Sequence, residues 1–234
     1  MNPIAPTTYT ALLAVLTKKE TSQRDLAREL GVSLGQTNKV FQWLEQNRFV
    51  ERTAATGRAT GKAKRDVYVL TNPTGLLRAV SLFRDMNRLM LFTMAVDTSR
   101  EDLLSDLREH SVIFCLGTAL ERFSKFYRSD EVSFYAVGGT GRGRADELRE
   151  SLAARREGIT RLACYSLDTR THGRREREDV RPREAIDRLT SCGFAEKTPR
   201  GVFTTKVQTV VDLFCDGKAF AARDLLKELW GINL

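Results

Sequence analysis

Hydrophobic positions in residues 22–48 recur at the three- and four-residue spacing of helices. They form two apolar faces, made of Leu26, Ala27 and Leu30 and of Val40, Phe41 and Leu44. Gly31 lies between the faces, where a left-handed backbone conformation costs glycine little. Ser22 and Ser33 precede the two helices, and each hydroxyl can accept from a free N–H group of the first turn. The pattern predicts a helix, a short turn and a second helix.

The first half of the second helix carries short polar side chains and one cation. Such groups suit hydrogen bonding to base edges and phosphates in the major groove of DNA. We therefore interpret the segment as a helix-turn-helix whose second helix contacts DNA through Ser33, Gln36, Thr37, Asn38 and Lys39. Two amphipathic helices joined at a glycine also occur in all-α proteins that do not bind DNA. The flanking segments are therefore needed to favour DNA binding.

The flanking segments complete the order of a winged helix over residues 1–75. An apolar pattern predicts a helix at about 8–19, and β-prone runs predict strands at 48–53 and 66–70. Between these strands, residues 55–65 are rich in glycine and hold four cations and no acid: Arg58, Lys62, Lys64 and Arg65. A cationic hairpin tip can follow the phosphate backbone or enter the minor groove. The alternative is an ordinary solvated loop.

The exit from this hairpin supplies a family resemblance. Tyr68, Leu70, Thr71 and Gly75 resemble the end of the wing in MarR-like and related prokaryotic winged-helix regulators. The resemblance extends over about residues 8–77. It implies double-stranded DNA as the partner and identifies no operator.

We call the predicted winged helix, residues 1–75, the head. After it, helical patterns alternate with a few strand patterns, which predicts an α+β protein. Residues 76–98 form an expected helical connector, and residues 99–234 form an expected mixed α/β domain. Its expected helices are 100–109, 112–127, 144–156, 182–192, 206–215 and 218–230, and its expected strands are 131–137, 159–167 and 202–204. The glycine-rich run 138–143 matches neither standard phosphate-binding spacing, which favours a simple turn over a nucleotide site.

The charge of the chain is concentrated in the head. The whole chain is 41% hydrophobic with a net charge of +8. Residues 1–95 contain 14 Lys and Arg against 7 Asp and Glu, whereas residues 96–234 contain 24 against 23. A basic head on a neutral body is typical of a nucleic-acid-binding protein.

Cysteine usage and hydropathy indicate a cytoplasmic protein. The four cysteines, Cys115, Cys164, Cys192 and Cys215, are widely spaced in apolar surroundings, and only His110 and His172 could join them in a metal site. This spacing argues against zinc and for buried, reduced thiols. No apolar run approaches the ~18 residues of a membrane span, and the first residues lack the pattern of a signal peptide.

A second resemblance covers the body. Residues 114–137 resemble the start of a nucleotidyltransferase-like fold, with Gly117 and Thr118 at its glycine motif. Residues Arg128, Ser129 and Asp130 would then stand near the entry to the next strand. Residues 204–231 resemble the tail of AbiE-type antitoxins of type IV toxin–antitoxin pairs, through Gln208, Asp212, Leu213, Gly217, Ala222 and Leu225. These antitoxins join a winged helix to a nucleotidyltransferase-like body, so the resemblance, with the predicted winged helix included, spans most of the chain.

The carboxylates depart from that resemblance. Nucleotidyl transfer uses alternate carboxylates on one strand to share Mg²⁺, whereas Asp130 and Glu131 are adjacent and would face opposite sides. We therefore expect a catalytically degenerate body, with no catalytic residue, no metal and no cofactor.

These patterns predict a transcriptional regulator that binds DNA through its head, with a body that oligomerises, senses a ligand or contacts a protein partner. A homodimer is expected because winged-helix proteins often bind two half-sites. The alternatives are an autoregulating antitoxin, an architectural chromatin protein and a divergent nucleotidyltransferase.

Overall fold

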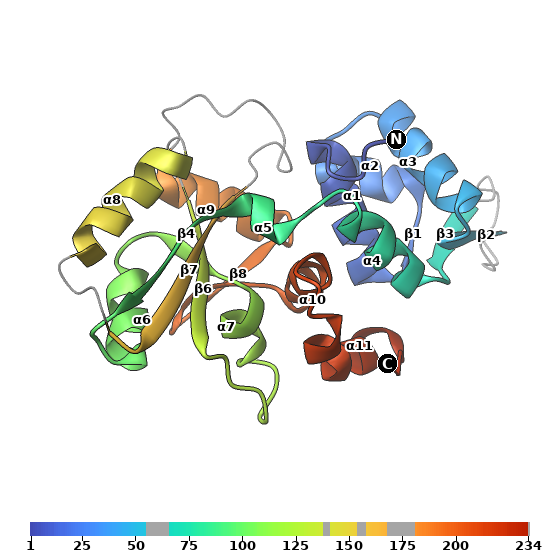
Figure 1. The fold of residues 1–234 in the computed structure, drawn as a ribbon. Coiled ribbons are helices and arrows are strands. Elements are labelled where there is room, and N and C mark those ends of the chain that lie inside the picture. Colours follow the sequence, from blue (N-terminus) through green and yellow to red (C-terminus); the bar gives the residue numbers. More distant parts are fainter. Residues whose placement is uncertain (55–65, 138–140, 154–157, 168–180, 234) are drawn as a thin grey trace. The chain divides into compact units, whose positions relative to one another are not determined.

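The computed structural model describes residues 1–54, 66–137, 141–153, 158–167 and 181–233. The chain forms an α+β protein of two compact units, the first being Met1–Phe83 and the second beginning at Arg84 (Figure 1). Among the described residues, no helix is both long and apolar enough to cross a membrane.

The first unit contains four helices and a three-stranded antiparallel sheet within its described part. Its helices are α1 (Pro6–Lys18), α2 (Gln23–Leu30), α3 (Leu34–Gln46) and α4 (Pro73–Ser81). Its strands are β1 (Glu20–Thr21), β2 (Val50–Ala54) and β3 (Asp66–Leu70), in the order β1-β3-β2. The two-residue strand β1 is too short to produce an alternating pattern, and the sequence did not predict it.

The predicted helix-turn-helix is confirmed as a local structure. Ser22 Oγ accepts from the Asp25 amide at 3.1 Å, and Ser33 Oγ accepts from the Gln36 amide at 3.2 Å. Gly31 ends α2 in the left-handed region with φ of +62°. Both apolar faces pack inward, since Leu26, Phe41 and Leu44 are completely buried.

One detail of the first unit differs from the prediction, and one predicted segment lies outside the described residues. Helix α1 begins at Pro6 and not at Thr8, because a proline at the first turn gives up no hydrogen bond there. The predicted wing tip, residues 55–65, lies outside the described residues, and with it lie Arg58, Lys62, Lys64 and Arg65. The strands on either side, β2 and β3, pair in register from Val50 with Leu70 to Ala54 with Asp66.

The expected helical connector at 76–98 is wrong. Helix α4 ends at Ser81, a single turn of helix α5 (Met86–Leu89) follows, and Met90–Val96 is strand β4. The apolar run over Leu89–Val96 suits a helix and a strand equally well by spacing alone. Pairing of β4 with strand β7 (Thr160–Ser166), about seventy residues away in the chain, decides it.

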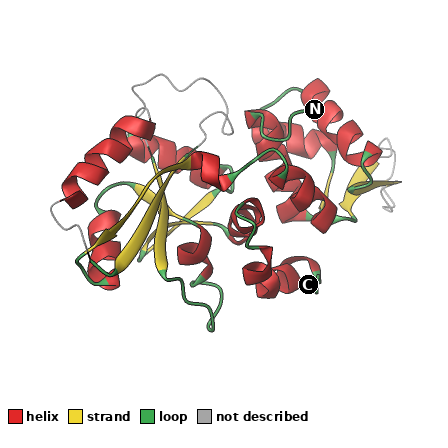
Figure 2. Ribbon diagram, in the orientation of Figure 1, coloured by secondary structure: helices red, strands yellow, loops and turns green. Residues whose placement is uncertain are grey.

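The second unit is built on a six-stranded mixed sheet in the order β4-β7-β6-β5-β9-β8. Its remaining strands are β5 (Val112–Phe114), β6 (Glu131–Ala136), β8 (Ala195–Thr198) and β9 (Gly201–Thr204). Strands β6 and β7 are parallel, as are β5 and β9, and the other neighbours are antiparallel. Figure 2 shows helices on both sides of this sheet.

Alternate residues of β6 divide the packing between the two faces. Val132, Phe134 and Ala136 join the core beneath helices α6 (Arg100–Arg108) and α8 (Gly141–Ala153). Tyr135 faces the opposite side, where helix α10 (Lys206–Cys215) lies. The other helices are α7 (Leu116–Leu120), α9 (Pro182–Ser191), the 3₁₀ helix η2 (Ala219–Ala222) and α11 (Arg223–Trp230).

The predicted helix at 112–127 is wrong over much of its length. Val112–Phe114 is the buried strand β5, and the helix after it, α7, ends at Leu120. Three successive buried apolar residues do not distinguish a central strand from a helix turn. Strand β8 was also missed, because Glu196 and Lys197 give it a polar character at the edge of the sheet.

Candidate nucleic-acid interface

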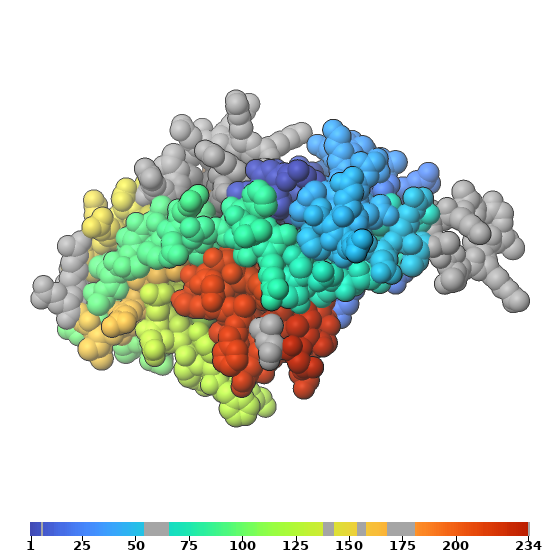
Figure 3. Space-filling view, turned by 45° about the vertical axis from the view of Figure 1, so that its right-hand side comes forward, coloured from blue at the N-terminus to red at the C-terminus, as the bar shows by residue number. Residues whose placement is uncertain are grey.

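The outward face of α3 is the strongest candidate site in the first unit. At 100° per residue, the buried residues Thr37, Val40, Phe41 and Leu44 occupy one side of the helix. The opposite side carries Lys39, Gln42 and Gln46, all exposed. The space-filling view shows light-blue residues of this part of the chain on the surface of the unit (Figure 3).

Thr37 is an exception among the predicted groove-facing residues. Its side chain is 1% exposed, and its hydroxyl donates to the Leu34 carbonyl at 2.9 Å. Its short polar side chain was mistaken for a surface group, although Oγ can satisfy itself within the helix. Thr37 therefore belongs to the inward face and leaves the candidate set.

Ser33 and Gln36 have a structural task at the start of α3. They form a reciprocal capping box, in which Gln36 Oε1 accepts from the Ser33 amide at 3.1 Å and Ser33 Oγ caps the Gln36 amide. Both side chains are exposed. The glutamine three residues after the cap is a sequence signature from which this box can be recognised.

Asn38 connects the two helices of the motif. Gln23 Nε2 on α2 donates to Asn38 Oδ1 at 3.1 Å and to Tyr68 Oη on β3 at 3.0 Å. Asn38 is half-buried, and its carbonyl oxygen is already an acceptor within the protein. A bidentate contact with adenine uses both the oxygen and the nitrogen of asparagine. In this arrangement the bond from Gln23 takes one of the two acceptor positions of Asn38 Oδ1 and holds its side chain against α2.

Lys39 is the exposed cation of α3. No carboxylate of the described residues pairs with it. By contrast, Arg28 and Arg52 lie beside Asp25 and Asp66 and are partly neutralised. Lys39 therefore keeps its full charge for an anionic partner. With Gln42 one turn further, it gives the outward face an exposed cation and an exposed hydrogen-bonding group.

Capping and DNA contact at Ser33 can be separated by two substitutions. We expect Ser33→Ala to lower the free energy of unfolding of the first unit by about 1 kcal/mol, because the Gln36 amide loses its side-chain acceptor, Ser33 Oγ. Ser33→Asp should retain that stability, since aspartate caps equally well. Denaturant unfolding followed by Trp43 fluorescence, with Trp230 replaced by phenylalanine, measures both.

The same pair of variants tests a DNA contact. A carboxylate at position 33 repels phosphates, so Ser33→Asp should weaken DNA binding although it preserves the cap. Equal stability of Ser33→Ala and the parent protein would contradict the capping role. DNA affinity unaffected by Ser33→Asp would remove Ser33 from the interface.

In the second unit, the glycine motif is a packing feature. A Cβ atom on Gly117 would lie 2.6 Å from Ser129 Oγ, so the close approach of these segments requires glycine. Thr118 Oγ1 donates to the Glu131 carbonyl at 3.2 Å and accepts from the Ser133 amide at 2.8 Å. The two residues thereby attach α7 to the start of β6.

Glu131 and Ser133 are the residues that decide whether β6 carries two carboxylates on one face. Asp130 precedes the strand, whereas Glu131 and Ser133 share one face of β6, and Ser133 Oγ donates to Glu131 Oε1 at 3.1 Å. The residue two positions after Glu131 on the same face of β6 is thus a hydroxyl and not a second carboxylate. Within the described ranges, no three His, Cys, Asp or Glu side chains cluster closely enough to hold a metal ion.

The body also contains a buried polar network that spacing along the chain did not predict. Asp212 on α10 is completely buried, and its Oδ1 lies 2.7 Å from Arg84 Nη1. Tyr135 Oη and Gln208 Nε2 donate to the same oxygen at 2.8 and 2.7 Å. Burial raises the pKa of Asp212, and the Arg84 guanidinium and these hydrogen bonds partly oppose that rise.

The cysteines are reduced thiols, of which Cys115, Cys164 and Cys215 are buried. Burial raises the pKa of Cys164 to about 12, from an ordinary value of 9.0. A thiol with a raised pKa in the folded state favours folding less as pH rises, because only the unfolded chain then loses its proton. The folded state is therefore destabilised relative to the unfolded state above about pH 9.

We expect this loss to appear as a difference between the parent protein and Cys164→Ala. From pH 9 to pH 11, the free energy of unfolding of the parent should fall about 2 kcal/mol further than that of the variant. The subtraction removes tyrosine and lysine titrations common to both proteins. A difference that stays constant across this range would contradict the assignment.

Comparisons with protein-family models, curated proteins and solved structures found no match to this chain.

Proposed function

We propose that the protein is a sequence-specific, DNA-binding transcriptional regulator whose first unit inserts α3 into the major groove. The observation that carries the proposal is the outward face of α3, where Lys39, Gln42 and Gln46 are exposed opposite a buried, mainly apolar inner face. A helix of this kind, held at its start by a capping box and braced by α2, meets the geometric needs of a recognition helix.

The electrostatic balance supports the same proposal. Residues 1–83 contain 12 Lys and Arg against 6 Asp and Glu, and the remaining residues contain 26 against 24. The positive potential therefore belongs to the unit that carries α3. Attraction to phosphates supplies affinity without sequence preference, and side chains on the outward face supply the preference.

The individual roles follow from the contacts. Lys39 binds a phosphate or the O6 and N7 atoms of guanine, and Gln42 forms hydrogen bonds with a base edge. Ser33 and Gln36 present the first turn of α3 to the DNA backbone. Asn38 contributes mainly by holding α3 against α2. The second unit has a non-catalytic role in this proposal, since Ser133 stands where a second carboxylate would be needed.

Selection from a library of randomised DNA duplexes, with the full chain, tests the proposal. An enriched motif supports a regulator, and its symmetry reports whether two copies bind two half-sites. Measurable DNA binding without an enriched motif would indicate an architectural protein and not a sequence-specific regulator. No DNA binding at low salt would overturn both.

Matched variants then connect the motif to α3. Gln42→Ala should weaken binding to the selected motif by roughly 1–3 kcal/mol while leaving non-specific affinity nearly unchanged. Arg78→Gln is the control, because Arg78 is an exposed cation on α4 of the same unit. If both variants change specificity equally, α3 is not the recognition element.

A further inference from the structure

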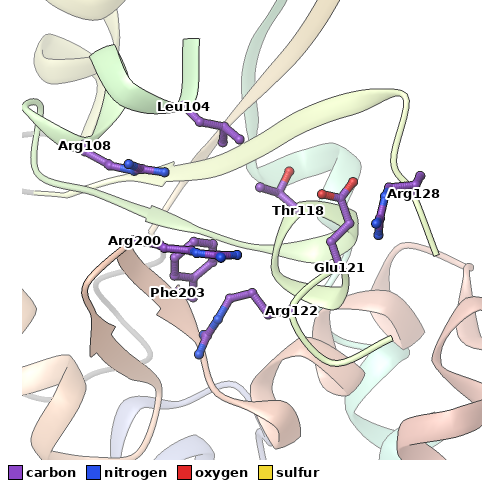
Figure 4. Close-up of a pocket in the computed structure, with 8 residues that line it drawn as sticks. All are labelled: Leu104, Arg108, Thr118, Glu121, Arg122, Arg128, Arg200 and Phe203. Carbon is purple, nitrogen blue, oxygen red and sulfur yellow. The ribbon is translucent and has the colours of Figure 1, made fainter. Parts of the chain in front are cut away.

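A cavity of about 440 Å³ lies within the second unit, lined from α6, from α7 and the loop after it, and from the β8–β9 hairpin (Figure 4). Its volume is within the range of small-molecule sites. Four of its lining residues are arginines, namely Arg108, Arg122, Arg128 and Arg200. Arg108 comes from α6 and Arg200 from the β8–β9 turn, whereas Arg122 and Arg128 share the loop after α7. Figure 4 shows the Arg108 and Arg200 side chains extending toward the same space.

Three of the four arginines keep their charge. In the part of the chain that the structure describes, no carboxylate forms an ion pair with Arg108, Arg128 or Arg200. Arg122 is balanced by Glu196, with Nη1 at 2.7 Å from Oε1. The cavity therefore has an excess of positive charge on side chains that are not engaged in ion pairs.

The acidic residue in the lining does not neutralise this excess. Glu121 Oε1 accepts from Arg100 Nη2 at 2.8 Å and from the Ser129 amide at 2.6 Å. These two hydrogen bonds fix the Glu121 carboxylate, and the positive charge of Arg100 compensates its negative charge. An anionic ligand would thus meet three arginines and no uncompensated carboxylate among the lining residues.

The cavity also has an apolar floor. Phe203 is 6% exposed and packs against Phe114 with ring centroids 5.0 Å apart. The Arg122 guanidinium carbon lies 4.5 Å from the Phe203 ring centroid, which fixes its orientation. Leu104 from α6 adds aliphatic surface. A ligand that carries only charge would leave this surface in contact with water.

We propose that this cavity binds a small organic phosphate, with the phosphate group on Arg108 and Arg200 and an apolar or aromatic part against Leu104 and Phe203. A phosphate monoester carries a charge of about −1.5 to −2 at neutral pH. It therefore neutralises more than one guanidinium group, whereas a ligand with a single carboxylate carries only a single negative charge. Arginine forks bind phosphate oxygens in pairs, and this adds directional preference. The site is independent of the DNA-binding proposal, since every residue it uses belongs to the second unit.

Calorimetric titration of the full chain with phenyl phosphate tests the proposal, with inorganic phosphate and benzoate as comparison ligands. Phenyl phosphate should bind at least about tenfold more tightly than either, because each comparison ligand lacks one of the two contacts. Equal binding of inorganic phosphate would overturn the apolar part of the site. Equal binding of benzoate would overturn its preference for phosphate.

Charge-neutralising variants locate the ligand. Arg108→Gln and Arg200→Gln should each weaken phenyl phosphate binding about tenfold. Arg149→Gln, an exposed arginine on α8 outside the cavity, should leave it unchanged. An unaltered unfolding midpoint by Trp230 fluorescence shows that each variant is folded. Equal losses in all three variants, or no binding by the parent protein at millimolar ligand, would overturn the site.

Discussion

Replacing Asp212 with alanine is expected to lower the free energy of unfolding of the second unit by about 3–5 kcal/mol. The substitution leaves the Arg84 guanidinium, 6% exposed, without the carboxylate that neutralises it. Tyr135 and Gln208 also lose a shared acceptor. A buried charge left uncompensated costs far more than an exposed ion pair does, which is why this effect should exceed most single substitutions.

The measurement must report on the second unit alone, because a two-unit chain need not unfold in one step. Trp230 lies on α11 of that unit, so its fluorescence in a Trp43→Phe background follows the relevant transition. Asp146→Ala on α8 is the matched control, since Asp146 is exposed and should change stability by less than about 0.5 kcal/mol. Equal costs for the two substitutions would show that the network contributes nothing.

A double replacement separates the cost of breaking the pair from the value of having it. Arg84→Met with Asp212→Leu removes both charges, and we expect it to recover most of the stability lost in Asp212→Ala. Buried ion pairs replaced by apolar residues of similar volume are often neutral or stabilising. No recovery would mean that the hydrogen bonds of Tyr135 and Gln208, rather than the charge, dominate.

Replacing the four cations of the predicted wing, Arg58, Lys62, Lys64 and Arg65, with alanine is expected to weaken binding to all DNA sequences. If each cation contacts one phosphate, the slope of log affinity against log salt should flatten by about 3–4 units. The preferred motif should not change, because phosphate contacts carry no sequence information. Fluorescence anisotropy over a salt series measures the slope, and motif selection measures the preference.

A charge-matched control distinguishes contact from general attraction. Lys18, Lys19, Arg28 and Arg78 are exposed cations elsewhere in the first unit, and their replacement by alanine removes the same total charge. Its effect on the salt slope should be much smaller. Wing and control variants with equal slopes would indicate diffuse attraction only, and unchanged binding in the wing variant would exclude the wing as a contact.

Local sequence signals predicted the first unit well. Ser22, Ser33 and Gly31 act on backbone groups within three residues, so their effect depends little on the rest of the chain. The outward position of Lys39 follows from helical periodicity in the same way. Residue type alone places Thr37 on the surface, whereas helical periodicity places it among the buried residues of α3, where the Leu34 carbonyl accepts from its hydroxyl.

Elements stabilised by distant partners were harder to predict. The segments Leu89–Val96 and Val112–Phe114 are apolar throughout, and their strand conformation comes from pairing with β7, β6 and β9. A helix satisfies its backbone hydrogen bonds locally, whereas a strand needs neighbours that sequence spacing does not identify. Predicted helices in this part of the chain were therefore the ones that failed.

The sequence by itself determined the order of helices in the head, their caps and the concentration of positive charge beside them, because these depend on neighbouring residues and on composition. Only the tertiary structure decided which charged residues of the second unit form a buried pair and which line a common cavity. Arg84 and Asp212 are 128 positions apart, and the cavity arginines extend from Arg108 to Arg200. Their chemistry depends on burial and proximity, which exist only once the six-stranded sheet has brought its distant strands together.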